Sequence, residues 1–279
     1  MPFFYDYYKS MGVAHFIFVN NDSSDSFSEW ASGKKDVSVF YTGASYKDAR
    51  FGVLWCNDLL RRYGCGHWCV VVDPDEFLVY PFVESRNLRA LTQFLDEQDR
   101  HCMHTIMLDA YSRDAPCRTI LGEGDDPFEI CPYFDRDGYV QEEGWGGGID
   151  IKGGPRQRSF FAGNPDDAPS LNKIPLIKWR RDFHYNMSTH NLWPTFLNNP
   201  QAAGNLSVTG ALFHFKMVTL LGEKVSEEMT RREHFANGME YQRYHGSLDK
   251  ELYANGISVR YRGSSQLVEL GLMSPGCWF

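Results

Sequence analysis

A chain of 279 residues with 43% hydrophobic and 23% charged residues has the composition of a globular protein rather than a disordered one. Its formal net charge of -8 argues against a protein that coats nucleic acid, although a nucleotide bound through a metal ion stays compatible with it. No apolar run is long enough to cross a bilayer, the first residues lack signal-peptide features, and the seven cysteines are an odd number, so we expect reduced thiols and a cytoplasmic protein.

Strand and helix patterns alternate along the first 110 residues. Short apolar, β-branched runs predict strands, and longer runs with apolar residues at helical spacing predict helices. The predicted elements are a helix over residues 2–10, strands over 13–19 and 36–42, a helix over 46–63, a strand over 68–72, a helix over 88–98 and a strand over 103–110. This order is typical of an α/β protein with a mostly parallel sheet flanked by helices.

The pattern changes after Tyr111. Residues 112–172 are rich in Gly, Pro, Asp and Arg, which predicts a long, partly irregular region over the active face. Apolar runs return over residues 173–217, and residues 222–245 have a helical pattern. We therefore expect one α/β domain over residues 1–217 and a helical C-terminal extension over residues 218–279 that packs on it.

The acidic turn Asp73-Pro74-Asp75-Glu76 follows the apolar run of residues 68–72, whose lack of alternation predicts a strand buried on both faces in the middle of the sheet. Three carboxylates within four residues repel one another, and at the carboxyl end of a buried strand, where α/β proteins bind ligands, they need a cation. Oxygen ligands favour Mg2+ or Mn2+. Asp-Pro-Asp is also the chemistry of an ordinary solvent-exposed turn, so both readings stay open on these residues alone.

Two further polar pairs lie at the ends of predicted strands. Asn21 and Asp22 follow the first strand, where they either contact a ligand or cap the next helix. His214 and Lys216 alternate with phenylalanines, so a strand would place both on one face. They are either a half-buried histidine and a surface lysine, or a metal ligand and a phosphate partner.

The chain resembles the glycosyltransferase family 2-like proteins of the Asp-Pro-Asp-Glu-Phe type, which have a GT-A fold. The resemblance covers residues 1 to about 217, in the order of the family's motifs. The matching stretches are Met11-Gly12-Val13-Ala14-His15-Phe16 with Asn20-Asn21-Asp22-Ser23-Ser24-Asp25, Val72-Asp73-Pro74-Asp75-Glu76-Phe77, Gly153-Gly154-Pro155-Arg156-Gln157-Arg158, Lys173-Ile174-Pro175-Leu176, Ser188-Thr189-His190 and Phe213-His214-Phe215-Lys216. The strand that normally precedes the first helix of this fold has no counterpart here, so the resemblance implies a GT-A-like sheet whose first strand is missing.

The resemblance implies metal-dependent transfer of a sugar from a nucleotide-sugar donor to a glycan or lipid-linked acceptor, with inversion. Asp73, Asp75 and His214 would be the metal ligands for Mn2+ or Mg2+. The nucleotide-sugar would contact Asn21, Asp22, Asp73, Arg156 and Lys216. His190 or Asp150 would be the base that takes the proton of the acceptor hydroxyl, and His190 is alternatively a third ligand of the metal.

The arginines Arg156 and Arg158 would bind phosphate or an anionic acceptor, unless they are simply exposed. A lipid-linked acceptor implies peripheral association with the inner face of a membrane. Two other functions use the same residues: a metal-dependent phosphoester hydrolase, and a non-catalytic remnant, truncated at its N-terminus, that binds sugar or nucleotide.

Overall fold

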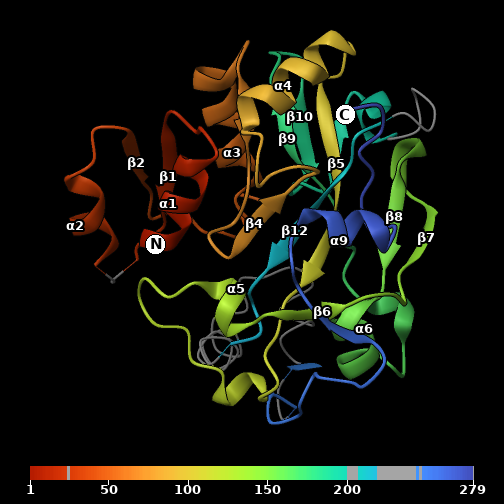
Figure 1. Ribbon diagram of the computed structural model, residues 1–279. Helices are drawn as coiled ribbons and strands as arrows, with labels where there is room; N and C mark the ends of the chain where they lie inside the picture. Colours follow the sequence, from red (N-terminus) through yellow and green to blue (C-terminus); the bar gives the residue numbers. More distant parts are fainter. Residues whose placement is uncertain (24–25, 200–206, 219–242, 245–246, 279) are drawn as a thin grey trace.

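The computed structural model describes residues 1–23, 26–199, 207–218, 243–244 and 247–278 (Figure 1). It shows a mixed α/β protein. The first part of the chain forms α1 (Pro2–Ser10), β1 (Phe16–Asn20), α2 (Phe27–Ser32), β2 (Val37–Tyr41), α3 (Val53–Leu59), β3 (Trp68–Val70), β4 (Glu76–Val79), α4 (Leu88–Glu97) and β5 (Cys102–Asp109). The second part forms α5 (Pro127–Ile130), β6 (Tyr133–Asp135), β7 (Val140–Glu143), β8 (Ile149–Lys152), α6 (Gly154–Phe160), β9 (Asn172–Lys178), β10 (His184–Met187), β11 (Asn191–Trp193), β12 (Gly210–His214), β13 (Ser258–Arg260) and α9 (Ser264–Glu269).

The central sheet has five strands in the order β3-β9-β5-β12-β4. Only β5 and β12 are parallel neighbours, and the other three pairings are antiparallel. The expected mostly parallel sheet is therefore wrong: the sheet is mixed. The strand predicted over residues 68–72 is also not central, because β3 is an edge strand of this sheet and its residues are only partly buried. Strand β9, from the second half of the chain, lies between β3 and β5 and is antiparallel to both, so β3 and β5 are not neighbours.

Helix α1 lies along the outer edge of β4. The hydroxyl of Tyr8 donates to the carbonyl of Glu76 at 3.0 Å and accepts from the amide of Leu78 at 3.0 Å, and the hydroxyl of Tyr7 donates to the carbonyl of Leu78 at 2.8 Å. The ring of Phe77 contacts both tyrosine rings. Side-chain hydroxyls thus take the place of a neighbouring strand, so the edge of β4 keeps its backbone groups bonded inside the protein.

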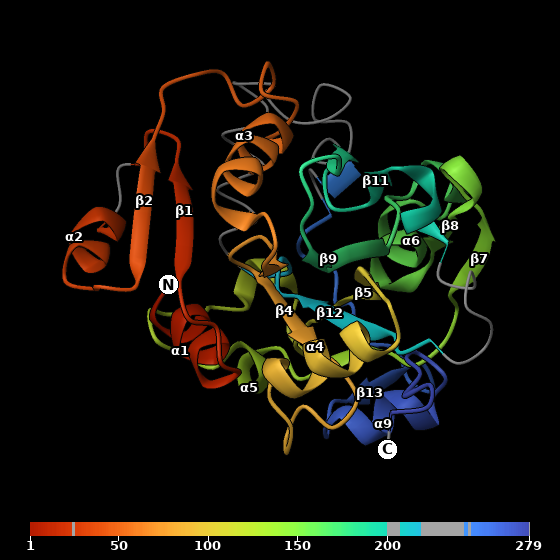
Figure 2. The ribbon, with the colours of Figure 1, turned by 90° about the horizontal axis from the view of Figure 1, so that it is seen from above.

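Strands β1 and β2 form a separate parallel sheet (Figure 2). Helices α1 and α2 are attached to one face of it through the ring of Phe18, which contacts Phe4 of α1 and Phe27 and Trp30 of α2. The strands predicted over residues 13–19 and 36–42 are confirmed as β1 and β2. Both are shorter than predicted, and β1 ends one residue later than the predicted strand. The described backbone pairings of the two strands are with each other and not with the five-stranded sheet.

The helix predicted over residues 46–63 begins later than its pattern indicates. Arg50 and Phe51 have φ of 50° and 58°, and Gly52 has φ of 80°, so the backbone is left-handed just before α3. Three consecutive left-handed residues cannot belong to a right-handed helix. Helix α3 therefore starts at Val53 and continues into a π-helical turn that ends at Gly64.

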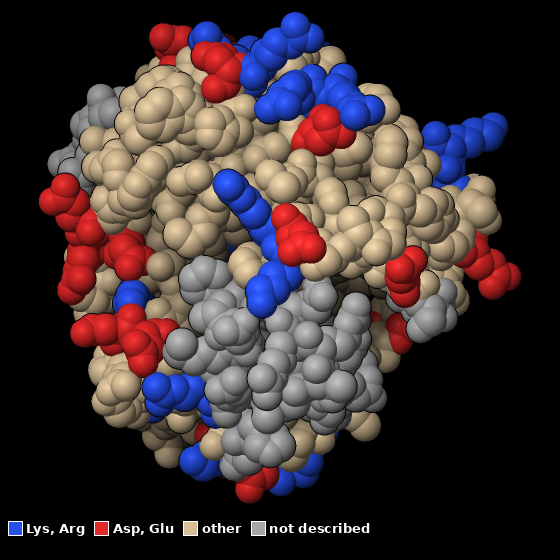
Figure 3. Space-filling view, turned by 180° about the vertical axis from the view of Figure 1, so that it is seen from behind, with Lys and Arg blue, Asp and Glu red and all other residues tan. Residues whose placement is uncertain are grey.

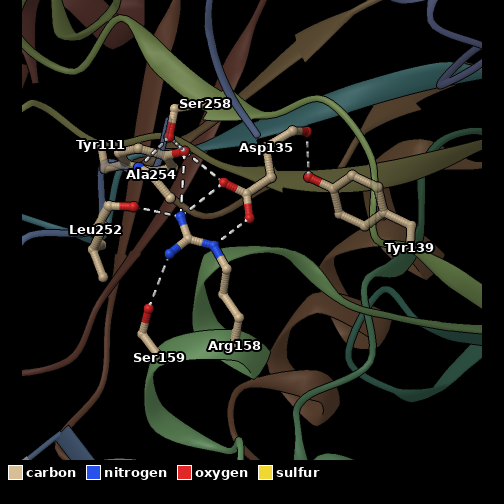
Figure 4. A network of polar contacts seen from close by, with 8 residues as sticks. All are labelled: Tyr111, Asp135, Tyr139, Arg158, Ser159, Leu252, Ala254 and Ser258. Carbon is tan, nitrogen blue, oxygen red and sulfur yellow. Dashed lines mark hydrogen bonds and ion pairs between the residues drawn. The ribbon is translucent and has the colours of Figure 1, made fainter. Parts of the chain in front are cut away.

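The region of residues 112–172 contains short elements held by a buried polar network (Figure 4). Arg158 of α6 donates from Nε to Asp135 of β6 at 2.7 Å and also bonds the carbonyl of Leu252. The hydroxyl of Tyr111 donates to Asp135 at 2.5 Å and lies 2.7 Å from the hydroxyl of Ser258. Arg158 therefore joins α6, β6 and the C-terminal segment, and the alternative that it is simply exposed is wrong.

The described part of the C-terminal segment packs on the main core. Strand β13 pairs antiparallel with β6, and Leu267, Met273 and Trp278 are buried in the cluster that also contains the five-stranded sheet. The helical pattern over residues 222–245 lies outside the described residues, except for Arg243 and Tyr244. Among the helices that the structure describes, none has the length and apolar character needed to cross a membrane. Figure 3 shows both signs of charge on one face, with Lys and Arg gathered along its upper rim.

Candidate active site

Acidic and basic side chains meet where three strands of the central sheet end. Strands β3, β5 and β12 run in the same direction, because β9 is antiparallel to both β3 and β5 and β12 is parallel to β5. The acidic turn lies at this edge, since the amide of Phe215, just after β12, donates to the carbonyl of Asp75 at 2.9 Å. We call the group found here the acid–histidine cluster: Asp73, Asp75, Glu76, Asp109, Arg156, Lys173 and His214.

His214 lies between two carboxylates. Its Nδ1 is 2.8 Å from Oδ1 of Asp109, and its Nε2 is 3.7 Å from Oδ2 of Asp75. His214 is opposite Asp109 on β5 and opposite Glu76 on β4 in the strand register, so the sheet itself sets the spacing. The side chain of Asp109 is fully buried, that of His214 is 10% exposed and that of Asp75 is 29% exposed. The arrangement is therefore open to ligands on the Asp75 side.

Asp109 is also bonded to Arg156, the first of the two arginines of α6. Nε of Arg156 lies 2.6 Å from Oδ2 of Asp109, and both side chains are buried. Burial raises the pKa of Asp109, but the charge of Arg156 and the hydrogen bond from His214 together lower it by more than burial raises it. The pKa of Asp109 is therefore below its ordinary value. Arg156 thus lies inside the cluster and neutralises Asp109. Its role as a residue that binds nucleotide-sugar stays a prediction.

A second buried ion pair supports the acidic turn. Nζ of Lys173 lies 3.1 Å from Oε1 of Glu76, and Oε2 of Glu76 accepts from the amide of Asp73 at 3.1 Å. Burial lowers the pKa of Lys173, but the charges of Glu76 and Asp73 together raise it by more than burial lowers it. The pKa of Lys173 is therefore above its ordinary value. Glu76 is 1% exposed, so it orients the turn and does not face a ligand.

The carboxyl of Asp73 is held in a repulsive environment. Burial and the negative charge of Glu76 raise the pKa of Asp73 to about 6. A divalent cation would favour the ionised form of this carboxyl.

The oxygen and nitrogen atoms of this cluster fit a divalent ion that takes its remaining ligands from water or from a bound phosphate group. The described residues contain no group of three or more His, Cys, Asp or Glu arranged to hold a metal ion. Asp75 and His214, however, face each other at 3.7 Å with one oxygen and one nitrogen. Two ligands of one ion lie about 3 Å apart when each is about 2.1 Å from it at a right angle, so a small movement suffices. Mg2+ and Mn2+ commonly take their other ligands from water and phosphate.

The two candidate bases lie on neighbouring segments. Nδ1 of His190, just before β11, is 2.6 Å from the carbonyl of Asn172 at the start of β9. Oδ1 of Asp150, on β8, is buried and has no hydrogen-bond partner among the described residues. Nζ of Lys216 lies 5.3 Å from the ring centroid of Tyr244. The contacts of His190 with Asn172 and of Lys216 with Tyr244 do not involve the acid–histidine cluster. The roles of His190, Asp150 and Lys216 stay predictions.

Asn21 and Asp22 follow β1, a strand of the separate two-stranded sheet. Nδ2 of Asn21 donates to the carbonyls of Thr42 and Ala44 at 2.8 Å and 3.0 Å, so this residue fixes the loop after β2. The cap position of α2 is Ser26, and the alternative that Asn21 and Asp22 cap this helix is wrong. Their contact with a nucleotide stays a prediction.

A cavity of about 360 Å³ lies at the β7–β8 hairpin. Its walls include two exposed glutamates, Glu142 and Glu143, and none of its lining residues belongs to the acid–histidine cluster. A polar recess with two carboxylates and no basic wall repels a nucleotide diphosphate. The acid–histidine cluster is therefore the better candidate site.

Two members of the cluster escape sequence-based prediction. Asp109 ends the predicted strand over residues 103–110, so a carboxylate at the end of an apolar run was a usable signal, the same one that marks Asp73. Lys173 lies in one of the stretches that resemble the family, but its ion pair with Glu76 could not be predicted, because the two residues are distant in the sequence. In comparisons with known proteins, no family model, no curated protein and no solved structure matches this chain.

Proposed function

We propose that this protein is a metal-dependent glycosyltransferase of the GT-A type. It would move a sugar, with inversion, from a nucleotide-sugar to a glycan or to a lipid-linked acceptor at the inner face of a membrane. One observation carries the proposal: the carboxylate of Asp75 and Nε2 of His214 face each other at 3.7 Å, at the edge where β3, β5 and β12 end. The acidic turn and the five further stretches that resemble the family support it.

The leaving group of such a transfer is a nucleotide diphosphate that gains negative charge as the glycosidic bond breaks. Mn2+ or Mg2+ supplies a Lewis acid that stabilises this charge when bound. Asp75 and His214 would hold the ion, and Asp73 would bind the ion or the ribose. Arg156 and Lys216 would contribute positive charge, and Asn21 and Asp22 would contact the nucleoside.

The acceptor hydroxyl must lose a proton as it attacks the sugar. An imidazole, such as that of His190, is a common general base, and Oδ1 of Asp150 has no hydrogen-bond partner among the residues that the structure describes. Replacing His190 by Ala distinguishes its two roles: donor binding is retained if His190 is the base and weakened if it is a metal ligand. Retained donor binding together with retained transfer would assign the proton to another residue, with Asp150 next to be tested.

Calorimetric titration with UDP and GDP, with and without Mn2+, tests the proposal. We expect binding that requires the metal in the wild type and is lost in Asp75→Asn. Asp96→Asn is a matched control, because Asp96 is an exposed aspartate bonded to Lys178 and Trp68 away from the cluster. Nucleotide binding that is unchanged by EDTA, or unchanged in Asp75→Asn, would contradict the metal site.

Product analysis separates transfer from the two other functions. A transferase moves the sugar of a bound donor to an added glycan or lipid-linked acceptor, whereas a hydrolase releases it to water at the same rate with or without acceptor. Metal-dependent binding without either product, in a chain that circular dichroism shows to be folded, would favour the non-catalytic alternative.

A further inference from the structure

Asp109 is a fully buried carboxylate whose two oxygens have different partners. Oδ2 lies 2.6 Å from Nε of Arg156, and Oδ1 lies 2.8 Å from Nδ1 of His214. The backbone holds this arrangement as well, because the amide of Ala110 donates to the carbonyl of His214 at 3.0 Å. A carboxylate paired with a guanidinium is an acceptor only, so the hydrogen between Asp109 and His214 belongs to Nδ1.

This hydrogen bond determines what the other nitrogen of His214 presents. A neutral imidazole carries one N–H, so Nε2 presents a lone pair when Nδ1 carries the hydrogen. That lone pair faces Oδ2 of Asp75 at 3.7 Å. With His214 neutral, this contact brings two acceptors together, and a divalent cation placed between them would be bound by both.

We propose that Asp109 is a positioning residue that fixes His214 as the Nδ1–H tautomer, so that Nε2 can bind a divalent cation together with Asp75. The proposal rests on the proposed function, because it assigns part of the same metal site. Arg156 has an indirect role: it keeps Asp109 ionised and holds its Oδ2, which leaves Oδ1 for His214.

The alternative is that Asp109 and Arg156 are only a structural ion pair. The protein contains a second such pair, in which Nε of Arg158 lies 2.7 Å from Oδ2 of Asp135. The side chain of Asp135 is 2% exposed, and that of Arg158 is 27% exposed against 4% for Arg156. Both arginines come from α6. The described contacts of Asp135 do not include His214, so Asp135→Asn is a matched control for the loss of a buried pair.

The replacement Asp109→Asn makes a definite prediction for the tautomer. An amide has one oxygen acceptor and an NH2 donor, and Arg156 can only donate, so the oxygen of the amide pairs with Arg156. The NH2 group then faces Nδ1 of His214, which must accept, and the hydrogen of the imidazole moves to Nε2. A protonated Nε2 cannot bind a metal ion, so the affinity for Mn2+ should fall.

Two measurements test this inference. Two-bond 1H–15N spectra of the metal-free protein, labelled with 15N-histidine and assigned with a His214→Gln variant, report which nitrogen is protonated. Titration with Mn2+ alone, and then with Mn2+ and UDP or GDP, reports affinity. In Asp109→Asn we expect the Nε2–H form and an affinity for Mn2+ weaker by about 10-fold to 100-fold. In Asp135→Asn we expect the wild-type tautomer and affinity, with a similar loss of stability.

A double variant, Asp109→Leu with Arg156→Met, serves if the single variant fails to fold, because it removes both members of the Asp109–Arg156 pair and leaves no acceptor for Nδ1 of His214 at position 109. In it His214 should no longer be held as a single Nδ1–H form. The inference is overturned if either variant keeps the Nδ1–H form, or keeps an affinity for Mn2+ within about twofold of that of Asp135→Asn.

The two proposals fail in different ways. A wild type that binds Mn2+ and nucleotide while Asp109→Asn binds them equally well overturns the positioning role and leaves the proposed function intact. A wild type that shows the Nδ1–H form of His214 but binds neither Mn2+ nor nucleotide overturns both the metal site and the proposed function, and only the tautomer assignment survives.

Discussion

Replacing Tyr8 by Phe tests how strongly a side chain can stand in for a strand at the edge of β4. The change removes one oxygen and keeps the ring, which is buried against Phe77. It leaves the carbonyl of Glu76 and the amide of Leu78 without their partner at 3.0 Å. A buried group without a partner costs about 1–3 kcal/mol, so the free energy of unfolding should fall by about 2–6 kcal/mol.

Urea unfolding followed by circular dichroism measures this loss. Tyr7→Phe is the matched control, since Tyr7 precedes Tyr8 and donates one partly buried bond, to the carbonyl of Leu78. Its loss should be about 1 kcal/mol or less, because water can replace a partly exposed partner. Equal losses in the two variants, or a loss below about 1 kcal/mol in Tyr8→Phe, would refute the idea that the Tyr8 hydroxyl completes this edge.

Two other predictions concern buried charge. Lys173→Met leaves Glu76 ionised and unpaired, and should lower the free energy of unfolding by about 3–5 kcal/mol. Adding Glu76→Gln to this variant should recover much of the lost free energy of unfolding. If denaturant titrations show that the losses of the two single variants add up in the double variant, Lys173 and Glu76 do not stabilise each other. Burial lowers the pKa of His104 from 6.5 to about 4, so the unfolded chain takes up a proton before the folded one as pH falls. The contribution of His104 to the free energy of unfolding should fall by at most about 3 kcal/mol between pH 6.5 and pH 4, and His104→Gln should remove this part of the pH dependence; parallel curves for the two proteins would contradict the assignment.

Local patterns predict several elements correctly. The helix predicted over residues 88–98 is α4, and the strand predicted over residues 103–110 is β5 with bounds shifted by one residue. Apolar periodicity depends on residues close in the sequence, so it predicts a helix or strand independently of how the elements are arranged in the fold. The exception over residues 46–63 also has a local cause, because the left-handed backbone before α3 interrupts a pattern that is otherwise helical.

Strand order is not encoded in such patterns. An apolar run of residues 68–72 has the same pattern whether its neighbour is parallel or antiparallel, and β9, which pairs with it, comes from a distant part of the chain. The resemblance to the family predicts Asp75 and His214 as ligands of one metal ion, and in the structure Oδ2 of Asp75 lies 3.7 Å from Nε2 of His214. The burial of Arg156 could not be predicted, because it depends on a carboxylate 47 residues earlier in the sequence.

The separation of β1 and β2 from the five-stranded sheet has a consequence for the dynamics of the protein. The described hydrogen bonds of these strands go to each other and to nearby helices and loops, and ring contacts such as that of Phe18 with Phe4 join them to α1. The pair can therefore open without breaking a backbone bond of the central sheet. Regions of this kind form cooperative units with an opening free energy below that of global unfolding. The amide hydrogens of β1 and β2 should accordingly exchange with solvent earlier than those of β5 and β12, and any ligand that contacts the end of β1 would slow that exchange.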